Sequence, residues 1–518
     1  MMKKYSLLIL FIAVLFTSCT KELSTTNEDP IITSETTLEE LNIPIDFDWK
    51  TTKTLEVQLL LPESAGLART KITSVDGSKL YFKGYPSDTT QKALNTKITV
   101  PAYLEVLKVS NGMTESFVDI QGNTLYHDFN NMDKSANSSN DVCGECDGQI
   151  TQLTLQYLGS ESSPLIKVTQ KKGGNHNFVI FEDNVSGDFG FVGANNHNKM
   201  GAKIKIYVNG EENVEIHTSC SITILAGMTF GDFLIVAGES DNGGPLCEVE
   251  EEEQESFSGT VIYEDLYPAK GDYDFNDLVV EYNYEIHKGD NNYVTDIEAV
   301  FTVKAFGASF HNAFGFQFPS IVPSDVLSVT GSVFKPSTIF NMASNGIEAA
   351  QTKATFIVYD DAFDIMSHPG SGIGVNTTPG SDYVEPVSVT INITFVANSV
   401  SFNDLDIGNF NPFIVMKQDR GYEVHLAGYE PTDLFDSNLF GVYDDDSNAG
   451  IARYFLTENN LPWAINIPDG FDYMNEKARI NTGYLMFTTW AQSGGVSYPD
   501  WFVNEPGYRN EANIYQIP

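Results

Sequence analysis

The chain has 518 residues, with 70 acidic against 30 basic side chains and a formal net charge of −40 at pH 7. This length is enough for several domains of about 100–200 residues each. The charge argues against nucleic acid and anionic lipid headgroups as partners, because both are bound by Lys and Arg side chains that neutralise phosphates. Cations are the natural electrostatic partners of such a chain, although a solubilising acidic surface is an alternative origin of the charge.

The start of the chain predicts an export signal at residues 1–19. Residues 3–4 are basic, and residues 7–16 form an apolar run of signal-peptide length that is too short to span a membrane. Small residues then precede Cys19, a pattern similar to the bacterial lipobox, in which the cysteine is lipidated and starts the mature chain. We expect a lipoprotein of the outer membrane, displayed at the cell surface or, alternatively, on the periplasmic face; ordinary secretion is the competing interpretation.

The next segments predict a tether followed by a small domain. Residues 20–41 are rich in Thr, Glu, Asn and Asp, a composition typical of a disordered tether. Residues 42–126 contain alternating or apolar runs separated by Asn and Gly turns, which predict a small β-sandwich. The runs lie at 54–61, 79–82, 97–100 and 104–109.

Four cysteines bracket a second β-rich block at residues 143–247: Cys143, Cys146, Cys220 and Cys247. Four cysteines in an exported protein indicate two disulfides. We expect Cys143 and Cys146 to pair with Cys220 and Cys247 rather than with each other, in an unknown connectivity. A Cys₄ zinc site competes because C-x-x-C is a common half-site, but the second pair lacks that spacing. Disulfides are therefore favoured.

The third block, residues 256–518, follows an acidic run that is typical of a domain boundary. Strand-like runs recur in it at 277–286, 294–305, 354–359, 387–397 and 412–415. The tail differs, because 450–460, 472–479 and 484–492 have helix-like patterns. The predicted fold is therefore mainly β, with tandem β-sandwich domains, the C-terminal one carrying a small helical appendage.

The most informative segment places four side-chain oxygen donors within six residues: Asp272, Asp274, Asn276 and Asp277. Ca²⁺ takes about six to eight oxygen ligands, and Asp or Asn at alternate positions can direct several of them to one point. The spacing fails the EF-hand pattern, because position six is Asp277 rather than Gly and position twelve is Asn283 rather than Glu. We predict a different kind of calcium site at the head of a strand, which Glu264 and Asp265 complete. The alternative is an acidic turn bonded to its own backbone.

Three other acidic clusters are secondary candidates for cations. Their members are Asp404, Asp406, Asn409 and Asn411 around Gly408, the triplet Asp444, Asp445 and Asp446, and the group Asp360, Asp361 and Asp364. Contiguous carboxylates repel one another at neutral pH, so the triplet is either solvated or neutralised by a cation.

Several unusual peptides give the third block a family resemblance. They are EDLYP at 264–268, KGDYDFNDLV at 270–279, HNAFGF at 311–316, RGYEVHL at 420–426, PTD at 431–433, LFGVYDDD at 439–446, NLPWAI at 460–465 and YPDW at 498–501. In this order they resemble the LruC domain family of bacterial outer-membrane lipoproteins and secreted proteins. The cysteine block more loosely resembles an uncharacterised exported β-domain of Bacteroidota and marine bacteria. These resemblances imply a cellular address and an architecture, but no activity.

An enzymatic interpretation finds little support in local motifs. No G-x-S-x-G elbow, H-E-x-x-H, P-loop or dinucleotide fingerprint occurs in the sequence, and only His311 and His425 fall in the family-like peptides. Tyr498, Trp501 and Tyr508 lie together near acidic residues and are typical of a sugar-binding surface or, alternatively, of an ordinary core.

The sequence thus favours an exported, lipid-anchored surface protein with structural Ca²⁺, acting in adhesion or in binding an extracellular glycan or protein. The alternatives are a carbohydrate-active or other hydrolytic enzyme without a recognisable motif, and a structural component of the outer membrane.

Overall fold

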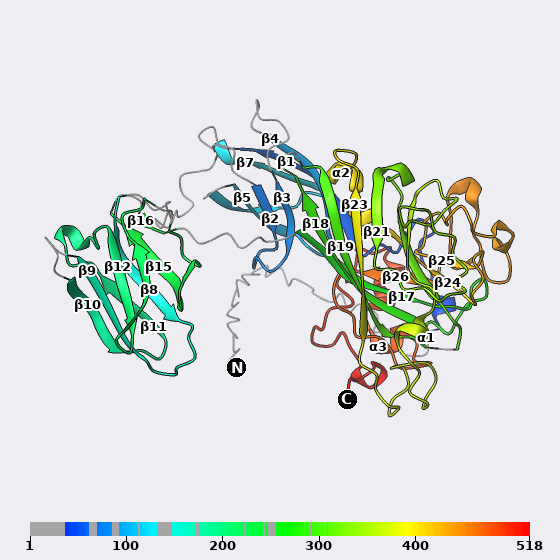
Figure 1. The fold of residues 1–518 in the computed structure, drawn as a ribbon. Helices are drawn as coiled ribbons and strands as arrows, with labels where there is room; N and C mark the ends of the chain where they lie inside the picture. The colour runs from blue at the N-terminus through cyan, green and yellow to red at the C-terminus, as the bar shows by residue number, and fades with distance from the viewer. Residues whose placement is uncertain are drawn as a thin grey trace, which may run out of the picture.

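The computed structural model describes residues 37–61, 70–84, 93–111, 114–131, 148–171, 177–221, 224–241, 244–246, 255–289, 292–307 and 309–518. Strands in these residues form six sheets, and the α-helices among them are short (Figure 1). The prediction of a mainly β chain with tandem sandwiches is confirmed. In the described part of the chain, no helix is long and apolar enough to cross a membrane.

The N-terminal sandwich has a three-stranded and a four-stranded sheet. The first has the order β4 (Ala93–Pro101), β1 (Thr52–Leu60), β7 (Thr124–Asp128), and the second β3 (Leu80–Gly84), β2 (Thr70–Thr73), β5 (Val106–Asn111), β6 (Thr114–Asp119). The 3₁₀ turns η1 (Leu38–Glu40) and η2 (Phe129–Asn131) flank these strands. In β1, Leu55, Val57 and Leu59 are buried and the residues between them are exposed, which is the period of two expected for a half-buried strand.

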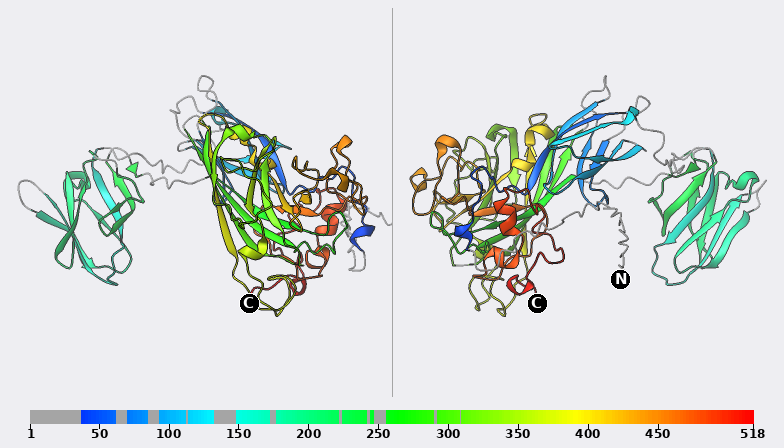
Figure 2. Two further views of the ribbon diagram at one scale, coloured as in Figure 1. Left: turned by 45° about the vertical axis from the view of Figure 1, so that its right-hand side comes forward. Right: turned by 180° about the vertical axis from the view of Figure 1, so that it is seen from behind.

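The middle sandwich also has two sheets. One has the order β10 (Asn177–Asn184), β9 (Leu165–Lys171), β12 (Lys203–Val208), β13 (Glu211–His217). The other has the order β11 (Asp188–Val192), β8 (Ile150–Tyr157), β15 (Phe233–Ser240), β14 (Thr229–Phe230), with β16 (Gly244–Pro245) also paired to β15 and η3 (Asn196–Asn198) nearby. This sandwich has a hydrophobic core of its own, and both views of Figure 2 show it apart from the other strands.

The C-terminal sandwich is the largest. Its six-stranded sheet has the order β21 (Val326–Thr330), β23 (Val387–Phe395), β19 (Val294–Ala305), β18 (Leu278–Lys288), β17 (Glu255–Tyr263), β26 (Ala464–Ile467). Its four-stranded sheet has the order β22 (Ala354–Tyr359), β20 (Ala313–Phe318), β24 (Asn411–Val415), β25 (Glu423–His425). Aromatic rings join the two sheets: Phe316 lies 5.1 Å from Phe301 and 5.7 Å from Tyr284 between ring centroids.

Short helical elements decorate the C-terminal sandwich. They are α1 (Ala362–Ile365), α2 (Phe402–Leu405), α3 (Ile480–Gly483), α4 (Phe487–Gln492), η4 (Pro323–Asp325), η5 (Ile407–Asn409), η6 (Ser437–Leu439), η7 (Ala449–Ile451) and η8 (Glu511–Asn513).

The N-terminal and C-terminal sandwiches share one hydrophobic core. A single cluster of buried side chains runs from Leu55 and Phe82 in the first to Phe402 in the second, and the rings of Phe82 and Phe402 lie 5.5 Å apart. The buried Lys288 ammonium sits over both rings, 4.4 Å and 4.1 Å from their centroids. Burial of apolar surface is the main favourable contribution to folding, so the two sandwiches stabilise each other.

A second core joins the first described residues to the last part of the chain. Phe47 and Trp49 pack against Trp490, with ring centroids 5.1 Å and 5.5 Å away, and the Trp49 indole donates to Asn460 O at 2.7 Å. Tyr273 and Phe275 belong to the same cluster of buried side chains. Residues 264–277, called the acidic loop from here on, are therefore anchored in this core by two aromatic side chains.

The prediction of helices at 450–460 and 472–479 is wrong, and that at 484–492 holds only from Phe487. In the first segment Ala452 and Phe455 take positive φ (53° and 51°), which a right-handed helix does not allow. In the second, Lys477 takes φ 66° and its backbone N–H donates to Asp274 rather than to a helical carbonyl. The tail is instead an irregular segment fixed by contacts with the sandwich.

Candidate metal centre

The candidate site lies in the connection between β17 and β18, residues 264–277. The two strands are antiparallel neighbours with Tyr263 opposite Leu278, so Glu264 and Asp277 leave the sheet side by side. Tyr273 and Phe275 take positive φ (62° and 53°) and bury their rings in the second core. Non-glycine residues in this conformation cost about 1–3 kcal/mol each, so packing of the two rings must hold the loop in shape.

Three carboxylates of this connection converge. Glu264, Asp272 and Asp274 each offer an oxygen, and these oxygens all lie within 4.8 Å of one another. Oxygens bound to one Ca²⁺ at about 2.4 Å lie no more than about 5 Å apart, so the spacing fits a shared cation. Glu264 and Asp274 are buried, whereas Asp272 is exposed and leaves the site open to solvent on one side.

The carboxylate of Glu264 is only half satisfied. One oxygen accepts the Phe275 backbone N–H at 2.7 Å, and the other is buried without any hydrogen-bond donor. Asp274 is held at both oxygens, by the backbone N–H groups of Asn276 (3.2 Å) and Lys477 (2.6 Å). An unpaired buried carboxylate oxygen is costly, and a bound cation would remove that cost.

The remaining donors of the predicted site lie beside this group. Asp265 accepts Asn312 Nδ2 at 2.7 Å through one oxygen and has its other oxygen buried without a donor. The backbone N–H of Asp265 donates to Asp277 at 2.9 Å. Asn276 donates through Nδ2 to Met474 O at 3.1 Å, and its side-chain oxygen is also buried without a donor.

Burial and mutual repulsion raise the pKa values of these carboxyls, so their charged forms are disfavoured unless a positive charge lies nearby. Burial, and then the charge of Asp272, raise the pKa of Asp274 to about 8, and burial raises the pKa of Asp265 to about 6. Burial followed by repulsion from neighbouring carboxylates raises the pKa of Glu264 and Asp277 well above their ordinary values. The folded site therefore favours whatever supplies positive charge, either protons or a metal cation.

Glu476 is a member of the site that the sequence did not reveal. Burial, followed by repulsion from Asp272, raises its pKa, and its Oε2 is buried without a donor. It lies in the segment 472–479, which docks on the loop: Ile480 N donates to Tyr273 O at 2.8 Å. Glu476 lies about two hundred residues after the loop, so no local motif could have identified it.

The secondary candidates Asp404 and Asp406 serve a turn. Asp404 accepts Ser401 Oγ at 2.6 Å, and Asp406 accepts Asn409 Nδ2 at 2.6 Å. Asn411 instead donates to Glu430 O at 2.9 Å. These short-range contacts favour an acidic turn rather than a cation site.

The triplet Asp444–446 does not converge either. Asp444 accepts Lys270 N at 3.0 Å, Asp445 accepts Ser447 Oγ at 2.6 Å, and Asp446 pairs with Arg453 at 3.0 Å. Each carboxylate has its own partner, so a cation is not needed to relieve their repulsion.

Asp360 and Asp361 are engaged by protein groups as well. Asp360 accepts Lys335 N at 2.9 Å, and the buried Asp361 pairs with Lys335 Nζ and with His311 Nδ1, the latter at 2.6 Å. Asp364 lies 3.3 Å from the same ammonium. His311 is therefore exposed but held by a buried carboxylate.

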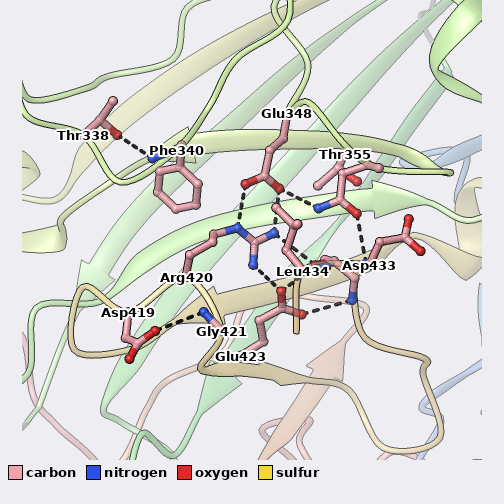
Figure 3. Close-up of polar contacts among 12 residues, drawn as sticks. Thr338, Phe340, Glu348, Thr355, Asp419, Arg420, Gly421, Glu423, Asp433 and Leu434 are labelled. Atoms are coloured by element: carbon pink, nitrogen blue, oxygen red, sulfur yellow. Dashed lines mark hydrogen bonds and ion pairs between the residues drawn. The ribbon is translucent and has the colours of Figure 1, made fainter. Parts of the chain in front are cut away.

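His425 belongs to a buried structural network. Its two ring nitrogens contact Asn411 Oδ1 at 2.8 Å and Glu423 Oε2 at 2.7 Å. Figure 3 shows Arg420 between Glu348 and Glu423; its guanidinium forms two 2.6 Å bonds to Glu348 and a further ion pair with Glu423. The peptide 420–426, part of the family resemblance, thus ties β25 to the loop that precedes β22.

Several predicted site residues fall outside the described residues: Cys19, Cys143, Cys146 and Cys247. Cys220 is disulfide-bonded, and the pairing of the four cysteines stays a prediction.

Two parts of the chain match known domain families. Residues 292–502 match a domain of unknown function, DUF4842, and residues 135–238 match another, DUF7467. The first match covers Glu476 and begins after the acidic loop. Both descriptions leave the function open, so they assign no activity.

No curated protein matches the chain. A solved structure of a candidate lipoprotein from Bacteroides ovatus is similar at a TM-score of 0.41 and 17% identity, covering 68% of this chain and 99% of that one. A similarity at this TM-score establishes neither fold nor function.

Proposed function

We propose that this chain is an exported, lipid-anchored surface protein whose C-terminal sandwich holds a structural Ca²⁺ at Glu264, Asp272 and Asp274. The calcium proposal rests on a Glu264 carboxylate that has one buried oxygen without a donor and that offers an oxygen within 4.8 Å of oxygens of Asp272 and Asp274. An all-oxygen donor set is typical of hard cations such as Ca²⁺ rather than of zinc or copper.

The role of the ion is to fasten distant segments together. The loop at 264–277 contacts the tail through Asp274 and Lys477, whose hydrogen bond is 2.6 Å long. Neutralising Asp274 and Glu264 with a cation removes the repulsion that opposes this closed arrangement. Calcium is thus proposed as a stabiliser of the C-terminal sandwich and not as a catalyst.

Surface display rests on the sequence: the lipobox-like start, the resemblance to LruC-domain lipoproteins and the excess of acidic side chains. Tandem sandwiches behind a membrane anchor suit adhesion, or binding of an extracellular glycan or protein. Glycan-array screening of the soluble chain tests this role, and binding to one defined glycan class supports it. If no glycan on the array is bound, the proposed glycan ligand is ruled out, and the calcium proposal is unaffected.

The calcium proposal is tested by thermal unfolding of the chain from residue 19 onward with Cys19→Ser, which prevents lipidation. We expect millimolar Ca²⁺ to raise the melting temperature over EDTA, because a ligand at a hundred times its Kd stabilises the folded state by about 2.7 kcal/mol. The shift is expected to shrink in Glu264→Gln, because that variant lacks a ligand of the proposed site. The matched control is Glu458→Gln, which changes an exposed glutamate in the same sandwich and keeps the full shift.

Equal melting curves in Ca²⁺ and EDTA for the unsubstituted chain would remove the proposal. So would an undiminished calcium shift in Glu264→Gln.

A further inference from the structure

We infer that the chain has a second divalent-cation site beside the first, formed by the side-chain oxygens of Asn276, Asp277 and Glu476. None of these atoms belongs to the group made by Glu264, Asp272 and Asp274. The inference rests on the proposed function only for the choice of Ca²⁺ as the ion.

The three oxygens surround one glycine. A β-carbon built on Gly307 would lie 2.4 Å from Asn276 Oδ1, 3.1 Å from Asp277 Oδ1 and 3.1 Å from Glu476 Oε2. The oxygens therefore face a common small volume that the missing side chain leaves free. Gly307 is held there because its N–H donates to Asn276 O at 2.7 Å.

Two of these oxygens are buried and have no donor. Asn276 is fully buried; its Nδ2 donates to Met474 O, which fixes the amide with Oδ1 turned toward the glycine. Asn276 Oδ1 and Glu476 Oε2 are both without a hydrogen-bond partner. A buried oxygen left unpaired destabilises the fold, and a bound cation that accepts its lone pair removes this cost.

The basic side chains that the structure describes do not supply the positive charge that this group of oxygens lacks. Within the described ranges, no Lys, Arg or His nitrogen forms an ion pair with Asp277 or Glu476, whereas Asp361 and Glu423 each have such a partner. Asp277 uses its other oxygen to accept Asp265 N at 2.9 Å, so its Oδ1 remains available. Among the described residues, no ion pair therefore neutralises these two carboxylates.

The donor set identifies the class of ligand. One amide oxygen and two carboxylate oxygens, without sulfur or imidazole, suit Ca²⁺, which accepts irregular oxygen geometry and completes its shell with water or carbonyls. The three donors come from the acidic loop and from the tail, and Lys477, next to Glu476, also donates to Asp274 of the first site. Two ions would thus clamp the same pair of segments.

The test counts bound Ca²⁺ per chain by isothermal titration and by native mass spectrometry on the Cys19→Ser chain. We expect two ions in the unsubstituted chain and one in Glu476→Gln. Gly307→Ala, which places a methyl group 2.4 Å from Asn276 Oδ1, is also expected to lose one ion. Gly470→Ala is the matched control, because no atom lies within 4 Å of its added β-carbon, and it keeps both ions.

Folding of each variant is checked by its circular dichroism spectrum and by retention of the first ion. One ion in the unsubstituted chain, unchanged in Glu476→Gln and Gly307→Ala but lost in Glu264→Gln, would overturn the second site and leave the first. An unsubstituted chain that binds no ion would overturn both. Two ions in every one of these variants would also overturn the assignment to Asn276, Asp277 and Glu476.

Discussion

The absence of a side chain at Gly271 leaves space for the Glu264 carboxylate. A β-carbon at this position would lie 1.5 Å from Glu264 Oε2, the oxygen without a donor, and that separation is far below any non-bonded contact. The glutamate is fully buried and its other oxygen is tied to Phe275 N, so it has little freedom to move aside. The absence of a side chain at 271 is therefore a requirement of the site.

We expect Gly271→Ala to reduce the calcium-induced rise in melting temperature by more than half, because the added methyl group displaces Glu264 Oε2 from Asp272 and Asp274. Gly470→Ala, with open space around its β-carbon, keeps the full rise. Thermal unfolding in Ca²⁺ and in EDTA measures both variants. A full calcium shift in Gly271→Ala would show that Glu264 Oε2 does not bind the ion.

The sequence predicts the donors of the loop but only part of the site. Asp272 and Asp274 are visible because they alternate within a few residues, and Glu264 because it closes the same hairpin. Glu476 is not visible, because its place beside the loop results from the irregular path of 472–479. A single sequence does not encode such a path in any periodic pattern.

Among the elements, β25 and the turn before it carry a network of buried ionisable groups, in which Glu423 contacts both Arg420 and His425. Burial alone would raise the pKa of Glu423, but the hydrogen bond from His425 and the charge of Arg420 hold it below its ordinary value of 4.5. A lowered pKa means that Glu423 stabilises the fold above pH 4.5 and that this contribution is lost as the pH falls through the folded-state pKa.

We predict that the stability advantage of the unsubstituted chain over Glu423→Gln is largest near neutral pH and shrinks below about pH 4.5. Urea unfolding of both chains at neutral pH and at about pH 3.5 measures the free energies of unfolding. Glu458→Gln, which changes an exposed glutamate, is expected to follow the unsubstituted chain at both pH values. A difference that grows on acidification would contradict the lowered pKa of Glu423.

Strands were easier to predict than helices for a physical reason. The segment 294–305 was predicted with the bounds that β19 has, because its alternating apolar residues face a sheet-covered core. The segments 450–460 and 472–479 show helix-like spacing, yet the backbone N–H of Phe455 donates to Ser447 Oγ and that of Lys477 donates to Asp274. These side-chain acceptors take the place of helical carbonyls, and local sequence patterns do not report them.

At the scale of the molecule, the N-terminal and C-terminal sandwiches share a hydrophobic core, whereas the middle sandwich has its own. The first core contains side chains of the N-terminal and C-terminal sandwiches, and the second joins Phe47 and Trp49 to the C-terminal helices. The middle sandwich has a separate core. The predicted domains 42–126 and 256–518 are separate in the sequence, but side chains from both pack into one core.

We expect the fragment 255–518 to melt at a lower temperature than the C-terminal transition of the full chain, because it exposes the faces that Phe82 and Trp49 cover. The fragment 143–247, which retains the four cysteines of the middle sandwich, is expected to keep the melting temperature that it has within the full chain. Differential scanning calorimetry of both fragments and of the full chain, all in Ca²⁺, measures the transitions. Equal melting temperatures for 255–518 alone and within the full chain would contradict the shared core.

The Trp49 indole and its acceptor Asn460 O are separated by 411 positions along the chain. A ribosome makes Trp49 long before Asn460 and Trp490, so the contacts of Trp49 with both residues cannot form in a chain that stops before them. Until Trp490 has been made, the rings of Phe47 and Trp49 lack the ring against which they pack, and contacts this distant in sequence are slow to form. A copy of the chain truncated before Trp490 therefore leaves Phe47 and Trp49 without this cover.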